Sequence, residues 1–230
     1  MNLKTPPLYI LCFLLLVFLV QDVHDWAHVL AIRATCHCWP VRMFGSWVLC
    51  GSPSGGQHAL ITVAGPLINV VLFLTGWALL DIENSVEEHS LGVALFFAAM
   101  PWTNLVAAFR GGGDITEFIR WIQRHGPTSN HALASRIGLI IALLIIVPGL
   151  IRAFLRLPGY KGKLIAFPLL LLLPDWLERL WYARLNKWFI GPDTGQWQAY
   201  MYVGAWSVLV AVGFFLTRRQ LKGLIRELSL

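Results

Sequence analysis

The sequence predicts an all-α polytopic membrane protein, and three observations support this fold class. First, 57% of the 230 residues are hydrophobic, and the mean hydropathy is +0.65. Second, only 13% of the residues are charged, about half of the roughly 25% that soluble domains carry. Third, apolar runs close to the ~20 residues that cross a bilayer recur along the whole chain. We therefore expect a multi-pass integral membrane protein.

About six transmembrane helices are expected, one on each apolar run. They cover residues 8–34, 58–80, 86–103, 131–150, 164–180 and 199–216. Ser85 and Glu88 form a capping-box pattern that starts the third helix. Two prolines interrupt the fifth segment, which favours a short or re-entrant helix there.

The chain after the third span is expected to change character. Pro101 weakens the helical pattern, and residues 104–113 are predicted to be irregular. An amphipathic helix then begins at Asp114 and runs to His125. This segment connects the third and fourth spans.

A small membrane-associated hairpin is predicted between the first two spans, over residues 35–57. The stretch contains aromatic and β-branched residues such as Trp39, Val41 and Trp47, and it closes with glycine, serine and proline at 51–56. Alternating strand formers followed by turn formers are typical of a hairpin.

Charge and cysteine usage limit the possible partners. The chain has 18 Lys and Arg against 12 Asp and Glu, and the basic residues lie between the apolar runs and in the C-terminal tail. Anionic lipid headgroups are therefore the expected partner, and nucleic acid is not.

The four cysteines form no C-x-x-C pair, which argues against a cysteine zinc site. Either Cys36 or Cys38 can pair with Cys50 in an oxidising compartment.

The first span carries four ionisable residues, Asp22, His24, Asp25 and His28. Such residues are costly inside a membrane and are functional candidates by default. His24 and His28 lie about 40° apart on a helix, so both imidazoles can face one ion with Asp25 beside them. This is the geometry of the H-E-x-x-H zinc motif, in which the Glu is the general base. Here Asp25 stands in the position of that Glu.

Asp114 is the candidate third ligand. The chain after the third span returns to the membrane face at which the first span ends, near the histidines. Asp114 is the only acidic residue between Glu88 and Glu117, and three protein ligands plus water make a catalytic zinc site. An ordinary helix N-cap is the alternative role for Asp114. The preceding glycine run favours close approach to a ligand, although a mobile loop is another explanation.

The second span contains Gly65, Pro66 and Asn69. Counting along both helices places residues 65–69 at the depth of His24. A kink here opens space beside the metal, and Asn69 can bind substrate backbone or polarise its carbonyl. The alternative is a tolerated kink with Asn69 bonding a neighbouring helix.

These patterns resemble the site-2 protease family of intramembrane zinc metallopeptidases over residues 20–118. The matching segments are His24 to His28, the hairpin at 35–57, Gly65 to Asn69, and Asn104 with the glycines that precede Asp114. The order and spacing of all four segments are similar to the family pattern. This sequence differs in having Asp25 for Glu, and in placing Asp114 after its glycines.

The resemblance implies a site and an activity. His24, His28 and Asp114 would bind zinc, Asp25 would act as general base, and Asn69, with Gly65 and Pro66, would contact substrate. The expected function is hydrolysis of peptide bonds in membrane or membrane-adjacent protein substrates by a zinc-activated water.

Residues 1–130 would form the catalytic core, and residues 131–230 would add the remaining transmembrane helices and a basic tail, all within one membrane domain. Two alternatives stay open. The first is a proteolytically inactive or weakened homologue that acts as a membrane binding protein. The second is a haem-binding membrane protein that uses His24 or His28.

Overall fold

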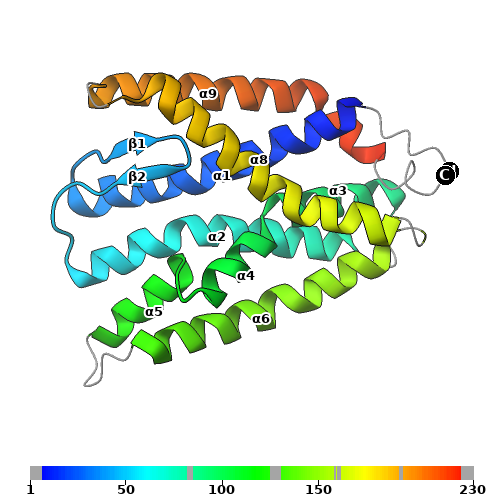
Figure 1. The fold of residues 1–230 in the computed structure, drawn as a ribbon, viewed down its shortest axis with the longest axis horizontal. Helices are drawn as coiled ribbons and strands as arrows, with labels where there is room; N and C mark the ends of the chain where they lie inside the picture. The colour runs from blue at the N-terminus through cyan, green and yellow to red at the C-terminus, as the bar shows by residue number, and fades with distance from the viewer. Residues whose placement is uncertain are drawn as a thin grey trace.

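The protein is a bundle of helices with one small hairpin (Figure 1). The computed structural model describes residues 7–81, 85–124, 131–157, 159, 162–191 and 194–223. Its α-helices are α1 (Pro7–Cys36), α2 (Gly55–Leu79), α3 (Val86–Ala98), α4 (Pro101–Phe109), α5 (Asp114–Arg124), α6 (His131–Arg156), α8 (Phe167–Phe189) and α9 (Gln196–Thr217). A π-helical turn (Gly162–Ala166) precedes α8, and a 3-10 helix (Arg218–Gly223) follows α9. The strands are β1 (Val41–Met43) and β2 (Ser46–Val48).

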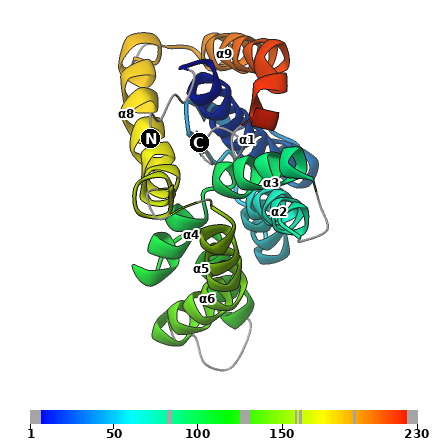
Figure 2. The ribbon, with the colours of Figure 1, turned by 90° about the vertical axis from the view of Figure 1, so that its right-hand side faces the viewer.

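Helices α1 and α2 pack against each other at the centre of the bundle, and α3 packs on α2 (Figures 1 and 2). Helix α9 covers α1 on one side, while α5 and α6 lie on the other side beyond α2. The main apolar core joins α1, α2 and α3 through side chains that include Val17, Phe73, Phe96 and Phe97. The hairpin and α5 lie at the same end of the bundle (Figure 1).

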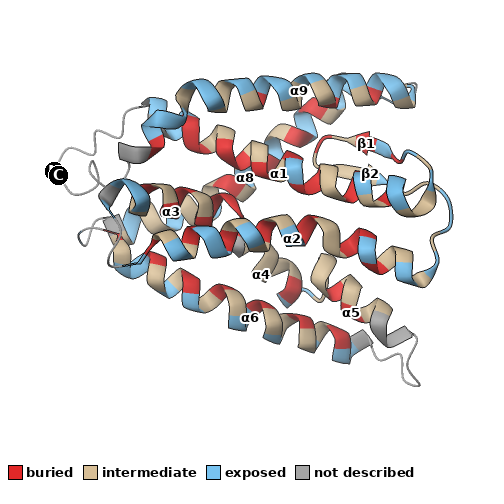
Figure 3. Cartoon of the chain, turned by 180° about the vertical axis from the view of Figure 1, so that it is seen from behind, coloured by how far each residue is buried: buried red, intermediate tan, exposed pale blue. Residues whose placement is uncertain are grey.

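Five helical segments of the described chain are long and apolar enough to cross a membrane. They are Ile10–Cys36, Gly55–Leu79, Glu87–Phe109, Ala132–Arg156 and Gln196–Leu221. The outer helices expose large apolar side chains, for example Leu144 on α6 and Leu216 on α9 (Figure 3). Extensive exposed apolar surface of this kind fits contact with lipid. The predicted class of all-α polytopic membrane protein agrees with this architecture.

The predicted fifth span, residues 164–180, falls in the π-helical turn and α8, and this helix is not among the five candidates. Helix α8 carries five charged residues, so its composition differs from that of the other long helices. They are Asp175, Glu178, Arg179, Arg184 and Lys187. The leucine run supports a span, the two prolines indicate a short or re-entrant one, and the charged residues of α8 exclude it from the candidates.

The third span begins as predicted and then departs from the prediction. Ser85 and Glu88 form the capping box, with the Ser85 N–H donating to Glu88 Oε2 at 2.7 Å. The prediction of irregular structure over 104–113 is wrong for 104–109, which belong to α4 (Pro101–Phe109), and is confirmed for 110–113. Met100 has left-handed backbone angles (φ 48°, ψ 58°) and separates α3 from α4. Proline is well suited to a first helical position, so Pro101 starts a new helix after this break.

Helix α5 agrees with the predicted amphipathic helix from Asp114, and it is described to Arg124. His125, at the predicted end, lies outside the described residues, as does the boundary at residue 130. Arg226 of the basic tail is also outside them.

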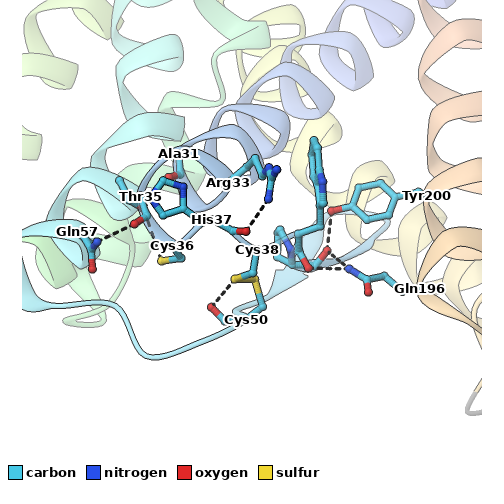
Figure 4. The surroundings of a disulfide bond; sticks show 12 residues. Ala31, Arg33, Thr35, Cys36, His37, Cys38, Cys50, Gln57, Gln196 and Tyr200 are labelled. Carbon is cyan, nitrogen blue, oxygen red and sulfur yellow. Dashed lines mark hydrogen bonds between the residues drawn. A yellow bond between two sulfur atoms is a disulfide. The ribbon is translucent and has the colours of Figure 1, made fainter.

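The hairpin between α1 and α2 is a two-stranded antiparallel sheet in which Arg42 pairs with Trp47. A disulfide joins Cys38 to Cys50 at its base (Figure 4), and Cys36 is a free thiol. Of the two pairings that the sequence leaves open, the structure has the one through Cys38. Helix α9 holds the same region, because the Tyr200 hydroxyl donates to the Pro40 carbonyl at 2.6 Å (Figure 4).

The disulfide gives a first testable prediction. Disulfides persist in oxidising compartments, so we expect the hairpin end on the non-cytoplasmic side of its membrane. Denatured protein, trapped without reductant, should accept a maleimide-polyethylene glycol label only at Cys12 and Cys36. After reduction all four cysteines should be labelled. Labelling of Cys38 and Cys50 before reduction would contradict the pairing.

Candidate metal centre

Two histidines of α1 and the first residue of α5 converge on one point. The Nε2 atoms of His24 and His28 lie 3.2 Å apart. Asp114 Oδ2 lies 3.5 Å from His24 Nε2 and 3.6 Å from His28 Nε2. One ligand atom from each residue therefore lies within 4.8 Å of the others, and the group could hold a metal ion. Both histidines are buried.

The orientation of His28 is set by its second nitrogen. His28 Nδ1 lies 2.6 Å from the Ile61 carbonyl oxygen, which can only accept a hydrogen bond. The Nδ1–H tautomer leaves Nε2 with a lone pair that faces His24 and Asp114. The ring of Trp47 on β2 packs against this imidazole, with 5.2 Å between the two ring centroids. A backbone carbonyl behind a histidine is a common support for metal ligation.

Asp114 is presented by a glycine turn at the start of α5. Gly111 and Gly113 have φ values of +71° and +84°, which L side chains rarely adopt. The Asp114 side chain is 37% exposed, so this ligand lies on the open side of the group. Partial burial raises the pKa of the Asp114 carboxyl. When the imidazoles of His24 and His28 are protonated, their hydrogen bonds and positive charge outweigh this effect and hold the pKa of Asp114 well below its usual range. The group is thus a carboxylate, the form that binds metal.

Gly65 brings α2 against the imidazoles. A Cβ added at Gly65 would lie 2.6 Å from His24 Nε2 and closer still to His28 Nε2. Any side chain larger than hydrogen would therefore occupy the space between the ligand atoms. Gly65 therefore lies beside His24, as its predicted depth in the membrane implies.

Pro66 and Asn69 line a cavity beside this point. Asn104 of α4 and Ile115, the residue after Asp114, are also part of its lining. Asn69 Oδ1 is buried and has no hydrogen-bond partner among the described residues. Asn69 is thus available for a donor that enters the cavity, such as a peptide N–H.

Asn104 stabilises the break between α3 and α4. Its Nδ2 donates to the carbonyls of Ala99 and Met100, at 3.4 and 3.2 Å. These carbonyls lie at the break between α3 and α4, where helical bonding is interrupted.

Asp25 is buried and points to the hairpin. Its Oδ2 lies 3.0 Å from Arg42 Nη1, and Arg42 is fully buried. Asp25 also lies within electrostatic reach of His24 and His28. Sequence reasoning missed Arg42. One signal was present, because Asp22 and Asp25 place two acidic groups in an apolar span and a nearby basic residue is needed to balance them.

The geometry disfavours a haem bound by His24 or by His28. The Nε2 atom of each imidazole lies 3.2 Å from that of the other, which leaves no room for a macrocycle over either nitrogen. The same convergence, with a carboxylate on the third side, suits a single ion.

Comparisons with known proteins gave no match at a significant level. No protein-family model matches the chain, and no curated protein or solved structure matches it at that level.

Gly65 provides a second prediction. We expect Gly65→Ala to weaken metal binding by at least about 10-fold, because the added methyl lies among the ligand atoms. Gly204→Ala on α9 is the matched control, since a Cβ there meets nothing within 4 Å. Metal retained after dialysis is measured by mass spectrometry. Equal metal content in Gly65→Ala and Gly204→Ala would contradict the assigned position of the site.

Proposed function

We propose that the protein is an intramembrane zinc metallopeptidase with zinc on His24, His28 and Asp114. The observation that carries the proposal is the spacing of the three ligand atoms, 3.2, 3.5 and 3.6 Å. Zinc bonds of about 2.0–2.2 Å at tetrahedral angles place neighbouring ligands roughly 3.3–3.6 Å apart. Two histidines and one carboxylate also match the ligand types of catalytic zinc sites, which keep one position open.

The proposed chemistry is hydrolysis of a peptide bond. When bound here, zinc would polarise the scissile carbonyl and make water a better nucleophile near neutral pH. Asp25 would accept a proton from that water and deliver it to the leaving amine. The ion pair with Arg42 engages Asp25 Oδ2. Because a carboxylate accepts at both oxygens, the pair is compatible with proton transfer at Oδ1.

We propose that side chains lining the cavity contact the substrate. Asn69 Oδ1 would accept a backbone N–H, while Phe73 and Ile146 provide an apolar lining for a side chain. The metal group lies within a bundle of membrane-spanning candidates. We therefore propose a transmembrane or membrane-adjacent peptide as the substrate class, reached from the lipid bilayer.

A competing proposal is a metal-binding membrane protein without peptidase activity. The contact between Asp25 and Arg42 favours it, because a neighbouring cation lowers the basicity of a carboxylate. Asp in place of the longer Glu points in the same direction. Both proposals place a metal ion on His24, His28 and Asp114, and they differ in whether Asp25 acts as a general base.

Substitution of Asp25 distinguishes them. Asp25→Asn should keep one zinc per chain and lower cleavage by about 10²–10⁴-fold, the usual contribution of a general base. Asp25→Glu keeps a carboxylate but displaces it by one methylene, so it should lower cleavage less than Asp25→Asn does. The probes are fluorescein-labelled casein and synthetic single-span peptides in phosphatidylcholine vesicles. Products are identified by mass spectrometry and zinc by elemental analysis.

Asp81→Asn is the control, because Asp81 pairs with Arg152 after the far end of α2. It should match the wild type in both zinc and cleavage. Cleavage by Asp25→Asn at the wild-type rate would remove Asp25 from the mechanism. Zinc binding without cleavage in wild type, Asp25→Asn and Asp25→Glu would favour the binding protein.

A further inference from the structure

Arg42 is the only arginine of the described chain with no exposed surface. It lies on β1, and its two terminal nitrogens reach different carboxylates of α1. Nη1 is 3.0 Å from Asp25 Oδ2, and Nη2 is 3.5 Å from Asp22 Oδ1. Arg42 thus bridges two residues that lie three positions apart on one helix.

The bridge is favoured by charge and by shape. A buried carboxylate without a counter-charge is strongly unfavourable, and here one guanidinium serves two carboxylates. Guanidinium presents its nitrogens in a rigid planar fork, so Nη1 and Nη2 can lie at ion-pair distance from different carboxylates. Nη1 also donates to the carbonyls of Met43 and Ser46, so the hairpin itself fixes the side chain.

Helices α8 and α9 hold this arrangement from outside. Asn186 of α8 makes two hydrogen bonds of 2.9 Å to the backbone N–H and carbonyl of Phe44 at the hairpin turn. Tyr182 donates to Asp22 Oδ1 at 3.3 Å, and Ser207 of α9 donates to Asp22 Oδ2 at 3.2 Å. The C-terminal helices therefore secure both the hairpin and the carboxylate at the far end of the bridge.

We infer that Arg42 is a positioning residue that holds the Asp25 carboxylate where it can act as the general base beside the metal ligands. The inference rests on the proposed function and adds a task for the hairpin, α8 and α9. Asp25 is one methylene shorter than Glu, so the position of its carboxylate matters more. A misplacement of about 1 Å can cost roughly 100-fold in rate. The bridge to Asp22 restricts such movement.

The test compares zinc-loaded full-length wild type with Arg42→Gln and Arg42→Lys, using the casein probe in detergent. Arg42→Gln should keep one zinc per chain, lower kcat by about 100-fold and leave KM within about twofold. Arg42→Lys should recover part of kcat, since an ammonium group can pair with one carboxylate but lacks the fork. Arg152→Gln removes the ion pair with Asp81 and should leave kcat, KM and zinc unchanged.

A second variant guards against misfolding. Arg42→Gln leaves two buried carboxylates unbalanced, whereas Arg42→Gln with Asp22→Asn leaves only that of Asp25. If Arg42→Gln does not fold, the double variant should fold, bind zinc and show the same loss of kcat.

The outcomes separate this inference from the proposed function. Wild-type kcat in a folded, zinc-bound Arg42→Gln variant or in the double variant would overturn the positioning role and leave the peptidase proposal standing. Loss of zinc together with kcat would also overturn it, since Arg42 would then support the fold of the metal site. A zinc-bound wild type that cleaves no probe would overturn the proposed function, and the inference with it.

Discussion

Four ionisable side chains are buried on α1, and their need for partners determines which elements pack around that helix. Asp22, His24, Asp25 and His28 are each at most 7% exposed, within a helix that is otherwise largely apolar. Such groups are tolerated in an apolar bundle only when partners are brought to them. The structure supplies those partners from five other elements, β1, α2, α5, α8 and α9.

Helix geometry divides the four side chains into two sets. With His24 at zero, His28 falls at about 40°, Asp25 at about 100° and Asp22 at about 160°. The histidine side of α1 meets α2 and Asp114, and the aspartate side meets Arg42 and the C-terminal helices. Asp25 belongs to both sets, because it contacts Arg42 and interacts electrostatically with the histidines. The candidate base therefore connects the metal group to the second half of the chain.

The local patterns predicted much of this arrangement. The length of the apolar runs predicted α1, α2, α6 and α9, and the capping box predicted the start of α3. The four-residue spacing of His24 and His28, together with the position of Asp114, predicted which side chains could hold a metal ion. The apolar runs, the capping box and the histidine spacing each lie within one helix. The position of Asp114 follows because successive spans cross the membrane in opposite directions. The sequence does not predict α4, because a proline is compatible both with a helix end and with a first helical position, and Pro101 occupies the latter.

Long-range pairings were harder to predict. The bridge from Arg42 to Asp22 joins a strand to a helix, and one sequence does not show which basic residue turns inward. The contacts of Tyr182 and Asn186 span about 140 residues or more, so the role of α8 was also hidden. Likewise, the choice of Cys38 over Cys36 depends on the hairpin geometry, which sequence spacing alone does not specify.

We propose that His24, His28 and Asp114 hold one zinc ion with an open coordination position, and X-ray absorption at the zinc edge of the loaded protein probes these ligands. We expect nitrogen and oxygen neighbours at about 2.0–2.1 Å, outer-shell scattering from two imidazoles, and loss of one protein ligand in Asp114→Asn. Sulfur neighbours at about 2.3 Å, or a spectrum unchanged by Asp114→Asn, would contradict it.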